Sequence, residues 1–242
     1  ALQAAATLLA LGTVFSHDPS AAAKPPPPSS PPPSPQPPQS SLLYRTLAEH
    51  WGAMVRAGMV ATLFVLARVA NQLLLPLQVD NLRMGPASLG AITSLSYTVD
   101  CVTFLFTGCI SDRYGRKFLG VPAFCVWAWG LASIGWATDP RHLYLSGVLL
   151  GLASGLTGPM VAVLSTDFAP SPPLAVPFQS MFRLQSDLGS IAAPPLLGVL
   201  NESFSLQASA NAVAGAALFG ALWMTFVMEE PLRGAKNPIL SL

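Results

Sequence analysis

Six long apolar segments, separated by short polar connections, follow one another from Trp51 to Met228. They cover residues 57–77, 87–110, 118–138, 143–164, 178–200 and 207–228. Each holds about 20 residues or slightly more, the length that an α-helix needs to cross the hydrocarbon core of a bilayer. A spanning segment must satisfy its backbone hydrogen bonds internally, which a helix does. The pattern therefore predicts an all-α membrane protein, a six-transmembrane-helix bundle of up-and-down order.

Two segments of different character precede this bundle. Residues 1–15 form an apolar stub that is too short to span a bilayer, and we interpret it as a truncated helix of a longer protein. A signal-like or transit segment is the alternative, although no basic residue precedes the run. Residues 24–39 are almost only Pro, Ser and Gln, so we assign residues 16–50 to an extended linker. Residues 51–230 form the bundle, and residues 231–242 a cytoplasmic tail.

Composition supports a membrane protein and argues against other classes. Of the 242 residues, 52% are hydrophobic and 10% are charged, whereas soluble domains carry about 25% charged residues. The net charge of +1 comes without a basic stripe, so nucleic acid is not an expected partner. We interpret Cys101, Cys109 and Cys125 as small core residues, because they lie in apolar segments without metal-ligand spacing. We expect no cofactor, no metal and no enzymatic activity, since the three histidines are scattered and no catalytic motif is present.

Basic residues predict the orientation of the bundle. Arg113, Arg116 and Lys117 crowd the second connection, and further basic residues flank both ends of the bundle. The opposite side carries Arg83 and Arg141. Because Lys and Arg are concentrated in cytoplasmic loops, we expect the second connection and both ends of the bundle in the cytoplasm.

The same connection holds the most specific motif of the chain. Residues 108–117 read GCISDRYGRK. This run resembles the signature of the major facilitator superfamily, in which a glycine and a small residue precede D-R-x-G-R-K between the second and third helices. The resemblance continues through S-T-D at 165–167 and R-x-x-x-D-L-G at 183–189, followed by Pro194. It extends over residues 51–231, about three quarters of the chain.

The resemblance implies one half of a twelve-helix major facilitator fold and secondary active transport of a small solute by alternating access. It also implies a conformational latch, for which the matching residues are Gly108, Asp112, Arg113, Gly115, Arg116, Lys117 and Asp167. Gly108 lets another helix approach closely, and Gly115 allows a tight turn with positive φ. Asp112 can cap a facing helix of the other half, and Arg116 can pair with Asp167. A purely structural clamp is the alternative.

Other positions favour an exporter-like origin. Gly189, Pro194 and Gly198 match in part the fifth-helix pattern of exporters in this family. Drug exporters of this family carry an arginine linked to proton coupling in the fourth helix, and Gly147 occupies the position that corresponds to it. The resemblance therefore does not imply proton coupling by this residue. The linker suggests the C-terminal half of such a transporter and the complete motif suggests the N-terminal half, and both stay open.

A run of glycines on the fourth segment predicts close helix packing. Gly147, Gly151 and Gly155 recur every four residues and therefore share one face, with Gly158 following. Small residues at this spacing let a neighbouring backbone approach. Direct contact with a substrate is the alternative use of the same face.

Polar residues within the apolar segments are candidates for function, because a charge in hydrocarbon is costly unless it is paired or faces water. Arg68, Asn71 and Gln72 share a face of the first segment, since they are spaced i, i+3 and i+4. Asp100 lies near the middle of the next segment. We predict that these four residues line a cavity for a substrate or a proton, with Arg68 and Asp100 as an ion pair. A buried structural bridge between the same two residues is the alternative.

A second polar pair lies on the fifth segment. Arg183 and Asp187 are one helical turn apart, near the predicted cytoplasmic surface, so we expect a structural role for them.

The expected partners are a small-molecule substrate, the lipid bilayer and a second six-helix half. That half comes either from a part of the protein missing from this chain or from a homodimer. Whether a coupling ion is a further partner stays open. The alternative function is a non-transporting membrane receptor or scaffold that has the transporter fold.

Overall fold

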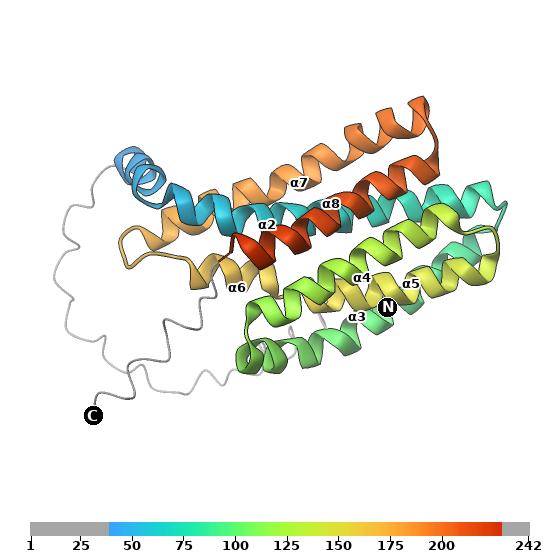
Figure 1. Cartoon of the computed structure of the whole chain (residues 1–242), viewed down its shortest axis with the longest axis horizontal. Coiled ribbons are helices and arrows are strands. Elements are labelled where there is room, and N and C mark those ends of the chain that lie inside the picture. The colour runs from blue at the N-terminus through green and yellow to red at the C-terminus, as the bar shows by residue number, and fades with distance from the viewer. Residues whose placement is uncertain (1–38, 229–242) are drawn as a thin grey trace, which may run out of the picture. The chain divides into compact units, whose positions relative to one another are not determined.

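The computed structural model describes residues 39–228, except for the side chains of Gln39, Ser40, Cys109, Asp112 and Tyr114. The apolar stub, most of the predicted linker and the predicted tail lie outside the described residues. Within residues 39–228 the chain forms seven helices and no strand (Figure 1). They are α2 (Gln39–Asn81), α3 (Pro86–Tyr114), α4 (Arg116–Trp136), α5 (Pro140–Thr157), α6 (Met160–Asp167), α7 (Ala175–Ser203) and α8 (Leu206–Phe226). The all-α prediction is confirmed.

Five stretches of the described chain are long and apolar enough to cross a membrane. They are Ser41–Asn81, Pro86–Gly108, Arg116–Trp136, Pro140–Asp167 and Leu206–Phe226. The fifth predicted segment, α7, is not among them although it has 29 residues. Polar side chains, including Arg183 and Asp187, make α7 less apolar than the other spans. Five of the six predicted spans are therefore long and apolar enough to cross a membrane, and the remaining helix, α7, packs along α2.

The fourth predicted span is interrupted between α5 and α6. Pro159 lies at the break and has no amide hydrogen to donate to the carbonyl of Gly155, four residues earlier. Thr107 of α3 replaces this donor, because its hydroxyl lies 3.0 Å from the Gly155 carbonyl oxygen. A side chain from a neighbouring helix thus satisfies the carbonyl that proline leaves open.

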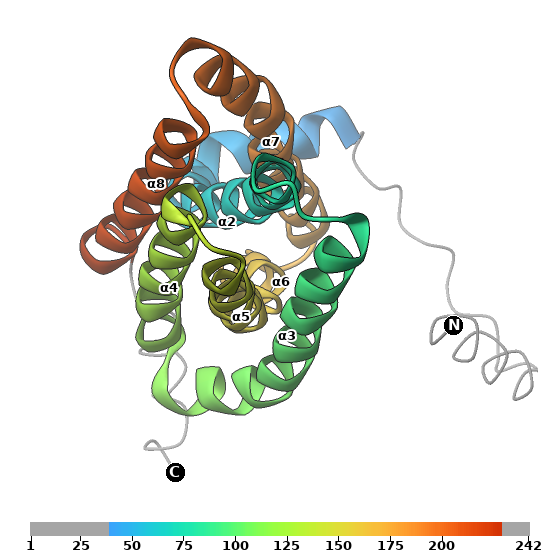
Figure 2. The same ribbon diagram turned by 90° about the vertical axis from the view of Figure 1, so that its right-hand side faces the viewer.

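Helix α2 is the central element and contacts every other described helix. Figure 2 views the bundle from one end, with α2 among its neighbours. The core lies between α2, α4 and α8, where the rings of Phe64 and Phe124 stack with centroids 3.9 Å apart. Gly220 of α8 faces the Phe124 ring, and a Cβ atom at this position would lie 2.5 Å from it.

The glycine face of α5 receives α3, as its spacing predicts. A Cβ atom on Gly155 would lie 2.7 Å from the backbone oxygen of Asp100, and one on Gly151 would overlap the backbone of Ser96. Gly147 meets Ile92 in the same way. The packing role predicted for these glycines is confirmed, because the backbone of α3 occupies the groove.

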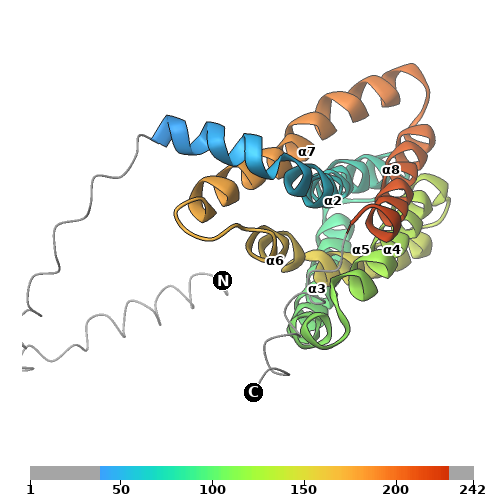
Figure 3. The same cartoon turned by 60° about the vertical axis from the view of Figure 1, so that its left-hand side comes forward.

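The first turns of α2 differ from the sequence prediction. Residues 39–50, which we assign to the extended linker, are helical and bend at His50, where φ is −118° and ψ is 17°. Figure 3 shows this start of α2, in blue, projecting beyond the rest of the bundle. Proline stops before this segment, and the Arg45 guanidinium lies 2.7 Å from the Glu49 carboxylate one turn later. Leucines and an i,i+4 ion pair therefore favour helix where the proline tract ends.

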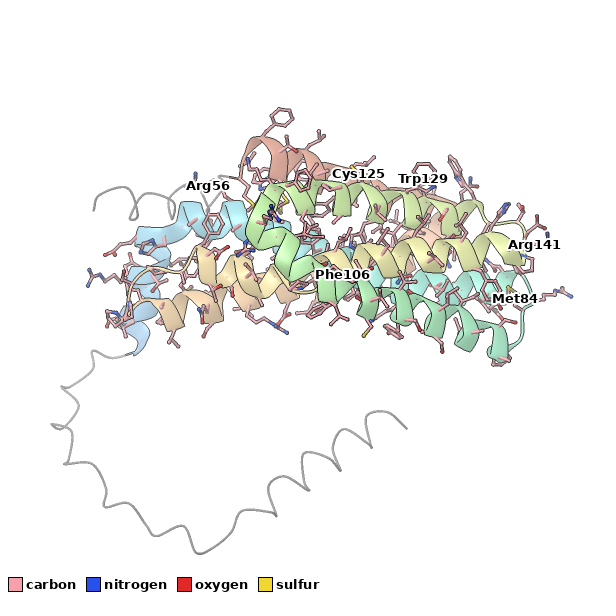
Figure 4. All side chains as sticks on the ribbon, turned by 90° about the horizontal axis from the view of Figure 1, so that it is seen from below. Arg56, Met84, Phe106, Cys125, Trp129 and Arg141 are labelled. Carbon is pink, nitrogen blue, oxygen red and sulfur yellow. The ribbon has the colours of Figure 1, made fainter. Side chains whose placement is uncertain are left out.

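The interpretation of the cysteines as core residues is wrong for two of them. Cys101 and Cys125 are free and exposed, and the side chain of Cys109 is not described. Figure 4 shows Cys125 on the outside of α4, together with Trp129, and Phe106 on the outside of α3. Trp129 is 73% exposed. In a membrane protein the outer surface faces lipid, so an apolar position need not be internal.

Candidate functional site

One end of the bundle holds a buried ion pair within the predicted latch. The Arg116 guanidinium Nε donates to the Asp167 carboxylate at 2.9 Å, and its Nη1 donates to the Ser111 hydroxyl at 2.6 Å. The side chain of Arg116 is only 9% exposed and that of Asp167 is 24% exposed. These contacts join the end of α3, the start of α4 and the end of α6.

Two other motif residues have local roles at the same end. Gly115, between α3 and α4, adopts φ 104°, the conformation that the sequence predicts and that glycine adopts without strain. The Lys117 ammonium donates to the Thr225 carbonyl at 3.1 Å, in the last turn of α8. A cation at a helix C-terminus satisfies a terminal carbonyl and interacts favourably with the helix dipole.

Gly108 and Arg113 of the motif are exposed. A Cβ atom on Gly108 would meet nothing within 4 Å in the described part of the chain, so no described helix makes the predicted close approach. Arg113 is exposed, and the side chain of Asp112 lies outside the described residues. Their predicted contacts with another half stay predictions.

A pocket of about 400 Å³ lies between α2, α3 and α5, away from the latch. All four residues that we predict for the cavity line it: Arg68, Asn71, Gln72 and Asp100. The structure adds seven others: Leu75, Pro76, Leu89, Thr93, Ser96, Tyr97 and Ser154. Sequence reasoning missed the polar members on α3, although Thr93, Ser96, Tyr97 and Asp100 are spaced i, i+3, i+4 and i+7, which places them on one helix face.

The predicted ion pair between Arg68 and Asp100 is wrong. No nitrogen of Arg68 lies within 4.0 Å of the Asp100 carboxylate among the described ion pairs. The carboxylate instead accepts a hydrogen bond from the Ser154 hydroxyl of α5, at 3.2 Å. The physical reason lies in the packing, because the backbone of α3 lies in the glycine groove of α5 and α3 has few contacts with α2.

One atom of a pocket residue lacks a described hydrogen bond. The side-chain oxygen Oδ1 of Asn71 is buried and has no hydrogen-bond partner among the described atoms. A buried acceptor without a donor costs free energy.

The polar pair on α7 forms as predicted and lies at the surface. The Arg183 Nε lies 3.4 Å from the Asp187 carboxylate, and the two side chains are 76% and 45% exposed. At this distance and exposure the pair contributes little to stability.

Metal binding finds no support in the described chain. Residues 39–228 contain no group of three or more His, Cys, Asp or Glu side chains that could hold a metal ion.

Comparison with known proteins identifies the family. The family model of the Major Facilitator Superfamily matches residues 57–240, most of the chain. A comparison with curated proteins finds no match. The match contains the latch and the pocket. It also contains four of the five apolar spans in full and most of the first, Ser41–Asn81. The chain therefore belongs to the Major Facilitator Superfamily of membrane transporters, as an integral multi-pass protein with the helices of one half of that fold.

Proposed function

We propose that the chain forms one six-helix half of a secondary active transporter, which moves a small solute by alternating access in an exporter-like manner. The observation that carries the proposal is the polar pocket, where Arg68 and Asp100 lie near the middle of two apolar spans. Charges at that depth are costly and are typical of solute pathways and proton relays. Secondary transporters place the substrate site near the midplane, between two repeats that rock against each other.

We assign solute contact to Arg68, Asn71, Gln72 and Asp100. Arg68 and the two amides offer hydrogen-bond donors, and the amide oxygens offer acceptors. Asp100 is the only carboxylate among the described residues that line the pocket. A coupling proton, if the transporter uses one, would therefore bind at Asp100.

The latch is assigned to the control of access at one end of the bundle. The Arg116–Asp167 pair ties α4 to α6, and the Lys117–Thr225 hydrogen bond ties α4 to α8. Loss of these contacts would let α6 move relative to α4. Gly108, Asp112 and Arg113 then meet the second half. By the positive-inside rule we place this end, and both ends of the bundle, in the cytoplasm.

Helix α3 supports a further partner of this half. Only 6% of its most apolar window is buried inside the chain, against 44–50% for the other four spans. Lipid and a second six-helix half are the two surfaces that can cover such a helix. We assign the second half to another part of the same protein or to a second copy of this chain.

Uptake by the full chain in proteoliposomes tests the proposal. Labelled mixtures of sugars, organic anions, organic cations and amino acids serve as probes. We expect one class to accumulate, and we expect Asp167→Asn to slow its uptake at least tenfold, because the latch loses its ionic contact. Asp139→Asn removes an exposed carboxylate at the other end of α4 and is the matched control.

The opposite outcome would favour the alternative function. If the folded chain is inserted in the liposomes together with a second six-helix half and no probe class accumulates, the transport proposal fails and a receptor or scaffold is favoured.

A further inference from the structure

We propose that the pocket between α2, α3 and α5 binds a small zwitterion, a solute that carries a carboxylate and a protonated amine. This inference rests on the proposed transport function and names the substrate class of the same pocket. It starts from two opposite charges, Arg68 and Asp100, that share one pocket without forming an ion pair.

Arg68 supplies the site for the carboxylate. Its guanidinium has no carboxylate within 4.0 Å among the described residues. The guanidinium is planar and always charged, and its donors match the two oxygens of a carboxylate. An isolated cation in an apolar span favours a ligand that brings an anionic group.

Asp100 supplies the site for the amine. The described contact of its carboxylate is the neutral hydroxyl of Ser154, and no cation among the described residues lies within 4.0 Å of it. An ionised carboxylate only accepts hydrogen bonds, and a protonated amine only donates them.

The combination of the two charges selects against simpler ligands. An organic anion would leave Asp100 without a counter-charge, and an organic cation would leave Arg68 without one. Such isolated charges are disfavoured away from water. A zwitterion compensates both and adds no net charge to the membrane interior.

Pocket size and the apolar lining restrict the ligand further. A volume of about 400 Å³ lies at the small end of the range for ligand pockets, so the solute is of metabolite size. Leu75, Leu89 and the Tyr97 ring contribute apolar surface to the lining of the pocket. A short aliphatic or aromatic side group on the zwitterion fits this lining.

The test uses the full chain in proteoliposomes, with labelled neutral L-amino acids as probes. Two analogue sets compete with them: amino-acid amides, which lack the carboxylate, and N-acetyl amino acids, which lack the charged amine. We expect the amino acids to accumulate and both analogue sets to compete at least tenfold more weakly. This panel needs only the wild-type chain, so it decides the question even if a variant fails to fold.

Two variants assign each charge to its group. Arg68→Gln should remove the preference for amino acids over their amides, and Arg68→Lys should keep part of it. Asp100→Asn should remove the preference over N-acetyl amino acids. Arg141→Gln and Asp139→Asn change exposed charges at one end of the bundle and should leave both preferences unchanged.

The results that would overturn the zwitterion inference differ from those that would overturn the transport proposal. Accumulation of an anion, a cation or an uncharged solute, with amino acids excluded, leaves transport intact and contradicts the zwitterion. Calorimetric binding of the amino acids by the chain, without uptake when a second half is present, supports the pocket assignment and contradicts the transport proposal. Absence of both binding and uptake for every probe contradicts both.

Discussion

The bundle holds two combinations of an arginine and an aspartate, one in the latch and one in the pocket. They differ in whether the two side chains form an ion pair. In the latch, Arg116 and Asp167 lie 2.9 Å apart, the arginine buried and the carboxylate partly exposed, and the Ser111 hydroxyl accepts another guanidinium hydrogen bond. In the pocket, Arg68 and Asp100 face the same space without an ion pair. The paired residues of the latch join helices of the chain, whereas the unpaired charges of the pocket can be neutralised by a bound solute.

Backbone packing explains the difference. The turn at Gly115 starts α4 beside the end of α6, which places Arg116 next to Asp167. The glycines of α5 hold α3 close, so the Asp100 carboxylate meets Ser154 and lies apart from Arg68 on α2. Charged residue types alone therefore do not decide whether a pair forms, because helix packing decides it.

The largest effect is expected from removal of the latch arginine. Arg116→Ala leaves the Asp167 carboxylate partly buried without its counter-charge, and the loss should be about 3 kcal/mol in the free energy of unfolding. Denaturation of the purified chain by SDS titration measures this loss. A loss below about 1 kcal/mol would mean that the pair contributes no more than a surface ion pair does.

A smaller loss of stability is expected from a change in the glycine groove of α5, which receives α3. Gly151→Ala puts a methyl group onto the backbone of Ser96, and we expect a loss of about 2 kcal/mol through overpacking. The shift of α3 should also weaken solute binding in the pocket. Gly198→Ala is the matched control, because nothing lies within 4 Å of its added Cβ atom.

Equal stability of Gly151→Ala and Gly198→Ala in the same SDS titration would contradict the close fit of α3 and α5.

The smallest effect is expected from the exposed pair on α7. Asp187→Asn removes a contact of 3.4 Å between exposed side chains, so the free energy of unfolding should change by less than about 1 kcal/mol. Glu49→Gln breaks the exposed pair with Arg45 on α2 and should behave alike. A loss above about 2 kcal/mol for Asp187→Asn alone would show that a second half buries this face.

The sequence predicts most of the fold because segment length and hydropathy alone indicate a spanning helix. It also predicts the glycine groove from local spacing, whereas the contact between Arg116 and Asp167, 51 residues apart, follows from the family resemblance. Spacing could not show that Arg68 and Asp100 stay unpaired, since this depends on how α3 packs between α2 and α5. Ser154 was missed for the same reason, because a lone serine in an apolar span carries no signal of its own.

The helical start of α2 was missed because the proline tract dominates the composition of the preceding residues. The polar face of α3 was missed although its spacing is regular, because serine, threonine and tyrosine are common on helices that only pack. The exposed cysteines show the same weakness, since hydropathy does not separate the inside of a membrane bundle from its lipid-facing surface.

The most direct test of the contrast between latch and pocket is uptake by Arg68→Gln, in proteoliposomes that hold equal amounts of folded protein. The open pocket predicts that this variant unfolds at the same SDS fraction as the wild type or later, because it loses an unpaired charge. It also predicts that uptake falls at least tenfold, while Arg141→Gln keeps wild-type uptake. Unchanged uptake by folded Arg68→Gln would contradict the assignment of the pocket as the solute site.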